Sequence, residues 1–122
     1  MRKMTQGQAE AAFTQAMIQF EKEYLGRGPV DARTHFIGDL ILVRLKGVLT
    51  PAEQKLAESN DGRALVKETR RQLFESSWTL LEEIVKHVTE TALVSLHTDM
   101  STKTGERIVV FVVDEDLNRR FS

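Results

Sequence analysis

Every residue from Ile108 to Val113 is apolar, and this run constrains the fold more than any other segment. Successive side chains of a β-strand point to opposite faces of its sheet. A strand here would have two apolar sets on opposite faces: Ile108, Val110 and Val112 on one, and Val109, Phe111 and Val113 on the other. A strand that is apolar on both faces is normally buried on both faces, so the chain must bury this segment deeply.

Periodicity and turn residues predict the other elements. Apolar spacing of three and four residues predicts helices over 6–25 and from about 61 to 88, and Thr50-Pro51-Ala52-Glu53 predicts the start of a short helix ending near residue 59. Strands are expected over 33–37, 40–46, 91–100 and 107–114. Gly38-Asp39 is expected to turn the first hairpin, and the polar segment 101–105 the second.

The resulting order, αββααββ, favours an α+β fold. We expect a two-layer sandwich in which helices pack on one face of a four-stranded, mainly antiparallel sheet. Residues 1–114 would form the single domain, and residues 115–122 a short charged tail that frays or forms one helical turn. The predicted core includes five large side chains of the helices: Phe13, Phe20, Trp78, Leu81 and Ile84.

The second apolar face of this sheet needs a cover, because one layer of helices covers one face. Two alternatives are open: the first helix forms a third layer, or a partner protein packs on the face. The simplest partner is a second copy, since twofold dimers are the commonest oligomers. We therefore predict a homodimer with an interface formed by five apolar residues: Leu40, Leu42, Val109, Phe111 and Val113.

Composition restricts the classes of function. The 17 Lys and Arg balance 18 Asp and Glu, for a net charge of −1, which argues against non-specific binding to nucleic acid. Without cysteine the chain has no disulfide or thiolate chemistry, as suits a reducing compartment. It shows no secretory signal and no apolar run near the ~20 residues that span a bilayer, so we expect a cytoplasmic protein.

The densest polar stretch is Thr98 to Glu106, and it has two interpretations. It is either an anion- or ligand-binding loop, or a hairpin connection whose Ser, Thr and Gly residues supply turn hydrogen bonds. The binding candidates in and beside it are His97, Asp99, Ser101, Thr102, Lys103, Thr104 and Glu106, with Arg44 and Lys46 on the second strand. His97 and Asp99 have a spacing compatible with metal ligation, but zinc needs three or four ligands, so no metal or cofactor is predicted.

Catalytic motifs are absent from the sequence. It contains no Gly-x-Ser-x-Gly elbow, and its carboxylates are scattered over helix surfaces, so a non-enzymatic protein is favoured. The order of elements invites comparison with KH-like RNA binders, which carry a glycine-bearing clamp loop between two helices. Here the turn is Ser59-Asn60-Asp61-Gly62, with an acidic residue where phosphate would lie, which argues against nucleic acid.

Segments 37–53 and 95–107, together with Gly26-Arg27-Gly28-Pro29, resemble a family of small bacterial proteins. The family is named after the C component of a Na⁺-translocating, membrane-potential-generating system, and the resemblance covers nearly the whole chain. It implies association with membrane components linked to cation or inorganic-carbon uptake, and it supplies no catalytic residues. Two functions therefore stay open: a dimeric accessory module of a membrane transport system, or a ligand-sensing or enzymatic domain that uses the loop 99–106.

Overall fold

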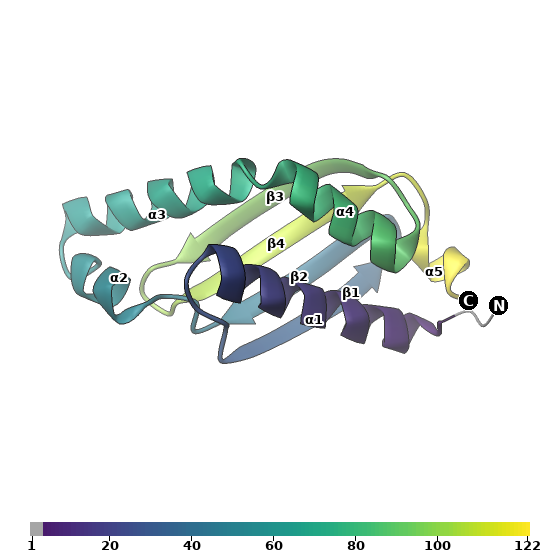
Figure 1. Ribbon diagram of the computed structural model, residues 1–122, viewed down its shortest axis with the longest axis horizontal. Coiled ribbons are helices and arrows are strands. Elements are labelled where there is room, and N and C mark those ends of the chain that lie inside the picture. The colour runs from purple at the N-terminus through teal and green to yellow at the C-terminus, as the bar shows by residue number, and fades with distance from the viewer. Residues whose placement is uncertain (1–3) are drawn as a thin grey trace.

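A computed structural model describes residues 4–122 as one α+β sandwich, which confirms the predicted fold class (Figure 1). The strands are β1 (Asp31–Ile37), β2 (Leu40–Lys46), β3 (Leu93–Ser101) and β4 (Glu106–Val113). The helices are α1 (Gln6–Tyr24), α2 (Pro51–Leu56), α3 (Asn60–Glu75), α4 (Trp78–Thr89) and α5 (Leu117–Arg120).

The sheet has the order β1-β2-β4-β3, and all three pairings are antiparallel. Both hairpins form where the turn residues predicted them, and Gly38 turns the first with a φ of +61°. The central strands β2 and β4 pair so that Ile41 lies beside Phe111 and Leu42 beside Val110. This register decides which set of β4 side chains faces the helices.

The helices lie over one face of the sheet (Figure 1). α1 packs against β1 and α4, while α3 and α4 pack against β3. Edge-to-face aromatic pairs join the layers, with ring centroids 5.1 Å apart for Phe13 and Phe111 and 5.5 Å apart for Phe20 and Phe74. Because α1 belongs to this same layer, the three-layer alternative is wrong.

Local capping explains where α2 begins. The Thr50 hydroxyl accepts a hydrogen bond from the Glu53 N–H, the Glu53 side chain accepts one from the Thr50 N–H, and Pro51 occupies the first turn. This is the capping box predicted from the sequence, and it satisfies donors that the first helical turn cannot satisfy itself.

The predicted long helix from about 61 to 88 is wrong: it is two helices that break at Ser76-Ser77. Both serine hydroxyls donate to the carbonyl of Leu73, and these local bonds compete with the helical ladder. The bend lets α3 and α4 follow different parts of the sheet, as Figure 1 shows.

The core contains Phe13, Phe20 and Leu81 as predicted, whereas Trp78 and Ile84 are only partly buried. The charged tail forms the predicted helical turn, α5, which packs on the domain. Leu117 is fully buried, and its N–H donates to the Gly38 carbonyl at 2.7 Å. The tail therefore holds the β1–β2 turn.

Candidate functional site

The face of the sheet opposite the helices is not covered by any element of residues 4–122. Cross-strand rows follow from the register. One row contains Ile37, Leu40, Val112 and Ser95, and the next contains His35, Leu42, Val110 and His97. The following rows contain Arg33, Arg44, Ile108 and Asp99, and then Asp31, Lys46, Glu106 and Ser101. We call this surface the open face.

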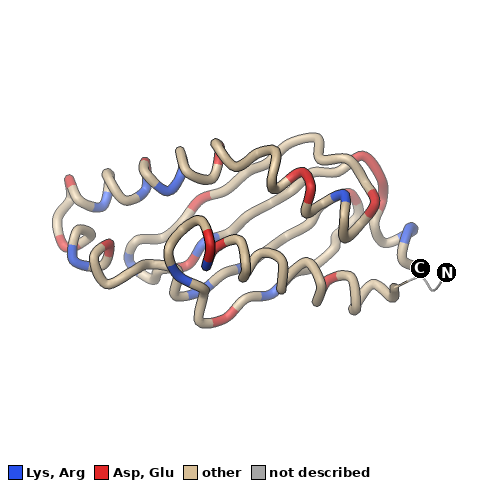
Figure 2. Tube along the Cα trace, in the orientation of Figure 1, with Lys and Arg blue, Asp and Glu red and all other residues tan. Residues whose placement is uncertain are grey.

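The open face has an apolar end and a charged end. Leu40, Leu42, Ile108, Val110 and Val112 are half-buried by one another, and Ile37 is exposed. The charged residues of the strands lie toward the end of the sheet nearest α2, as Figure 2 shows. Exposed apolar patches with polar borders are typical of interaction surfaces.

Three of the five predicted dimer residues are corrected by this arrangement. Val109, Phe111 and Val113 are 0%, 0% and 2% exposed because they face the helices, and Phe13 of α1 packs on Phe111. A shift of one residue along a strand moves a side chain to the other face. Leu40 and Leu42 remain on the open face, and their neighbours there are Ile108, Val110 and Val112.

The predicted binding residues are divided between the open face and a turn. His97, Asp99, Ser101, Glu106, Arg44 and Lys46 lie in the rows of the open face. Arg44 and Glu106 form an ion pair at 2.5 Å, and the Ser95 hydroxyl lies 3.3 Å from the His97 ring. Asp99 lies on the edge strand and contacts Lys67 of α3 at 3.3 Å around the edge of the sheet.

Thr102, Lys103 and Thr104 belong to the β3–β4 turn, and the hydrogen bonds there are those of a hairpin connection. The Gly105 N–H donates to the Ser101 carbonyl, and the Ser101 and Thr104 hydroxyls accept from the N–H groups of Thr104 and Glu106. Gly105 has a φ of +72°. The turn also accepts a bond from Val48, which fixes it against the segment after β2.

Gly62, the glycine of the turn that was compared with the clamp loop of KH-like RNA binders, has a packing role. Gly62 lies in the first turn of α3, and a Cβ built on it would lie 1.7 Å from the carbonyl oxygen of Leu56. Its N–H donates to the Ser59 hydroxyl. The residue therefore permits α2 and α3 to touch.

A group of buried charges lies between the helices and the sheet, and it is not among the sites predicted from the sequence. Arg70 and Arg107 are each 1% exposed, and Glu21 is fully buried. Arg70 donates to the Glu53 carboxylate and to the Val48 carbonyl, and its Nη1 lies 3.6 Å from Glu21. The Arg107 guanidinium lies 4.8 Å from the Phe74 ring centre and donates to the Thr98 hydroxyl.

Burial changes the acid–base behaviour of this group. Loss of water raises the pKa of Glu21 above its ordinary value, although the Arg107 and Arg70 charges oppose this. Burial lowers the pKa of the Arg107 guanidinium. Burial alone would raise the pKa of Glu53, but hydrogen bonds from Arg70 and from the Thr50 N–H hold it below its ordinary value.

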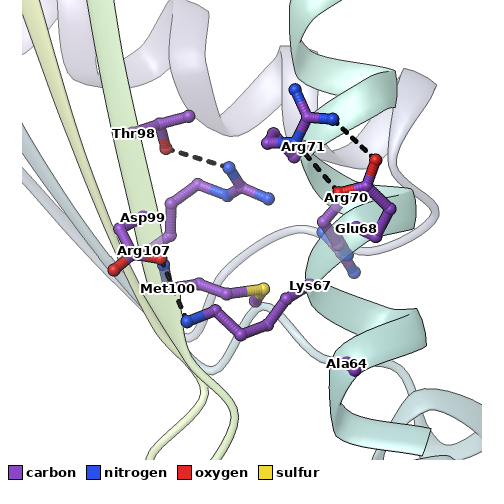
Figure 3. A pocket seen from close by; sticks show the side chains of 9 residues that line it. All are labelled: Ala64, Lys67, Glu68, Arg70, Arg71, Thr98, Asp99, Met100 and Arg107. Atoms are coloured by element: carbon purple, nitrogen blue, oxygen red, sulfur yellow. Dashed lines mark hydrogen bonds and ion pairs between the residues drawn. The ribbon is translucent and has the colours of Figure 1, made fainter. Parts of the chain in front are cut away.

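Beside these charges, between α3 and the edge of the sheet, is a cavity of about 220 Å³ (Figure 3). Its lining includes four cationic side chains, Lys67, Arg70, Arg71 and Arg107, and two acidic ones, Glu68 and Asp99. In Figure 3 the Arg107 side chain extends from β4 toward α3, and Lys67 reaches from α3 to Asp99. We call this the arginine cavity.

One sequence signal pointed toward this group. Glu21 follows Met17 by four residues and so shares the buried stripe of α1, whereas Tyr24, which the apolar pattern places on that stripe, is 52% exposed. A charged residue within an apolar stripe needs a buried partner of opposite charge. Nothing in the spacing identified Arg70 or Arg107 as that partner, because Arg70 reads as an exposed helix residue.

Residues 4–122 contain neither a metal-ligand cluster nor a membrane-spanning helix. Their His, Asp and Glu side chains nowhere gather in a group of three that could hold a metal ion. The described helices are also either too short or too polar to cross a lipid bilayer.

These features define a small α+β protein with an uncovered sheet face and a charged interior. Residues 5–115 match the family described as Na⁺-translocating membrane potential-generating system (MpsC). The chain belongs to this MpsC family. It is 41% identical to "Uncharacterized protein YbcI" of Bacillus subtilis (strain 168), over 96% of this chain and 94% of that protein. It is 26% identical to "Uncharacterized protein YrhF" of the same organism, over 88% and 89% of the two chains. No solved structure matches it significantly.

Proposed function

We propose that the chain is a non-catalytic accessory or regulatory subunit that works as a homodimer on the cytoplasmic side of a membrane transport system for cations or inorganic carbon. The observation that carries the proposal is the apolar end of the open face. Half-buried Leu42 and Val110 lie at its centre, on the two central strands, and no helix of residues 4–122 lies above them. Covering such a surface removes apolar area from water and so favours association.

A second copy fits this face because the rows are self-complementary. Consider a twofold axis that lies just above the open face, midway between β2 and β4, and runs parallel to the strands. It maps each row onto itself and exchanges β2 with β4 and β1 with β3. Leu42 then faces Val110 of the second copy, and Leu40 faces Val112.

Two charge pairs of the charged end are complementary under the same axis. Lys46 faces Glu106 of the second copy, and Arg33 faces Asp99. The two charged contacts each occur twice in such a dimer, since a twofold interface uses the same surface on both subunits. Complementary charges of this kind fix the register of an interface.

The membrane part of the proposal is supported by the family. The family is named after a Na⁺-translocating system that generates a membrane potential. Because no described helix is suited to cross a bilayer, the chain would act on such a system through contacts with other subunits.

The homodimer is tested by light scattering after size exclusion. We expect twice the mass of one chain at tens of micromolar, as for a standard small interface. Leu42→Lys should yield a folded monomer, because it places a charge at the centre of the interface. Leu65→Lys is the matched control: Leu65 is 55% exposed on α3, away from the open face, so this variant should stay dimeric. A monomeric wild-type chain, or equal behaviour of the two variants, would refute the interface.

Charge exchange tests the orientation of the two copies. Arg33→Glu and Asp99→Lys should each weaken the dimer, and the double variant should recover part of the loss, because these residues lie on opposite edge strands of one chain and face each other only across the axis. Additive losses in the double variant would exclude this axis.

The transport part is tested in cells. A strain without the chain should lose the Na⁺-dependent part of its membrane potential, measured with a potential-sensitive dye at several external Na⁺ concentrations. The wild-type chain and Leu65→Lys should restore it, whereas Leu42→Lys should not. Restoration by Leu42→Lys would show that the open face is not needed for the function.

A further inference from the structure

The arginine cavity contains hydrogen-bond donors that the described chain does not satisfy. Arg107 Nε and Nη2 and Arg70 Nη1 are buried and donate no hydrogen bond to residues 4–122. Arg70 and Arg107 are each only 1% exposed. Donors left without an acceptor in such a place are costly, and charged donors more so than neutral ones.

Glu21 does not explain these donors. Both of its carboxylate oxygens are themselves without a hydrogen-bond donor, and the shortest approach to Arg70 is 3.6 Å. Burial raises the pKa of Glu21 and so favours its neutral form. The partly buried carboxylate of Glu53 already accepts from Arg70 and Thr50. The buried group therefore has more donors than its own carboxylates satisfy.

The mouth of the cavity adds further charge. Lys67, 47% exposed, lies there in an ion pair with Asp99, which is 81% exposed. Arg71 is held by the carboxylates of Glu68 and Glu75 on its own helix. The Lys67 pair is exposed and of the kind that contributes little to stability, so Lys67 can turn inward at small cost.

We propose that the arginine cavity binds a small oxyanion of the phosphate or carboxylate class. Arg107 is held in place by the Thr98 hydroxyl and the Phe74 ring, which leaves its Nε and Nη2 as a two-pronged donor for two oxygens of the anion. Guanidinium groups suit this role because their planar donors match the spacing of carboxylate and phosphate oxygens. Arg70, which lines the same cavity, adds a second positive charge, and Lys67 closes the mouth.

Titration followed by NMR tests this site directly. The Nε–H signal of Arg107 should shift and saturate with sodium phosphate at constant ionic strength, at concentrations in the millimolar range or below, and not with sodium chloride. Sodium acetate tests the carboxylate alternative in the same way. An unsaturated response to both anions up to about 50 mM would overturn the proposal and leave ordered water as the partner of these donors.

Two variants at the mouth should change the affinity for phosphate in opposite directions while leaving the core intact. Lys67→Met should weaken phosphate binding about fivefold, and Asp99→Asn should strengthen it by a similar factor, as expected for one unit charge that acts over about 6 Å mostly through water at the open mouth. Lys55→Met on α2 is the matched control, since Lys55 is exposed and pairs with Glu58, and it should change nothing. Equal affinities in all three variants would place the anion elsewhere.

Removal of the central donor completes the test. Arg107→Met keeps most of the side-chain volume but removes the Arg107 signal, so binding to this variant is followed by the backbone N–H signals of Lys67 and Thr98, which line the same cavity. Their saturable shift with phosphate should be abolished in a chain that still folds. If Arg107→Met unfolds, the mouth variants decide the question alone. If it folds and still binds phosphate with wild-type affinity, the cavity is not the site. The proposal does not depend on the homodimer, because the cavity is formed within one chain.

Discussion

Gly62→Ala offers a sharp test of how the helices are packed. An exposed helix interior normally gains about 0.5–1 kcal/mol when Ala replaces Gly, because Ala loses less backbone entropy on folding. At Gly62 the new Cβ would lie 1.7 Å from the Leu56 carbonyl oxygen and 2.9 Å from the Ser59 hydroxyl. The carbonyl is backbone at the last residue of α2, so the helix itself has to move.

The displacement has a definite cost. Overpacking of this kind costs about 1–3 kcal/mol, and moving α2 also disturbs the contact between Glu53 and Arg70. After the gain in helix propensity, we expect a net loss of about 1–2 kcal/mol and a melting temperature lower by about 4–8 °C for a chain of this size.

The assay is urea unfolding followed by circular dichroism, with Gly7→Ala as the matched control. Gly7 also lies in the first turn of a helix, but a Cβ there has no neighbour within 4 Å. Gly7→Ala should therefore be neutral or slightly stabilising. If Gly62→Ala is as stable as the wild type, or if both variants shift alike, the close approach of α2 and α3 is not real.

Three further predictions follow from the core, the buried charges and the turn. Phe111→Ala should cost about 3–5 kcal/mol in urea unfolding, because Phe111 is fully buried against Phe13; a loss below about 1 kcal/mol would return Phe111 to the surface. The pKa of Glu21 is higher in the folded chain than its ordinary value of 4.5, so the stability that Glu21 contributes is lost as the pH rises from 4.5 through the raised pKa. Glu21→Gln should therefore flatten the decline of the urea midpoint with pH, and an unchanged slope would refute this reasoning. Lys103→Ala should stay within about 0.5 kcal/mol of the wild type, whereas Gly105→Ala should destabilise the chain because the φ of Gly105 is +72°. A lower melting temperature for Lys103→Ala than for Gly105→Ala would contradict the turn interpretation.

The local features of the fold could be predicted from the sequence because they depend on neighbouring residues. Thr50, Pro51 and Glu53 form their capping box within one turn, and Gly38 sits in a two-residue loop. The break at Ser76-Ser77 was missed because the apolar stripe continues across it through Phe74 and Trp78. Periodicity detects an amphipathic face, but it does not detect a bend that keeps that face toward the same sheet.

The inner face of β4 could not be predicted for a related reason. Both of its faces are apolar, so the alternation that normally identifies the core face is absent. The choice depends on long-range packing, since Phe13 of α1 meets Phe111 and not Val110 or Val112. The arginine cavity depends even more on tertiary structure: Arg70 and Arg107 come from a helix and a strand that are far apart in the sequence.

Asp99 connects the open face with the arginine cavity. It lies in a row of the open face, where the proposed axis brings Arg33 of the second copy toward it, and it also pairs with Lys67 at the mouth of the cavity. An Arg33 contact would compete with Lys67 for this exposed carboxylate and release Lys67 toward the anion. Thermodynamic linkage is reciprocal, so phosphate should then tighten the dimer by the same factor by which dimerisation tightens phosphate binding. In Asp99→Asn the shared charge is gone, and this coupling should disappear even where both binding events survive.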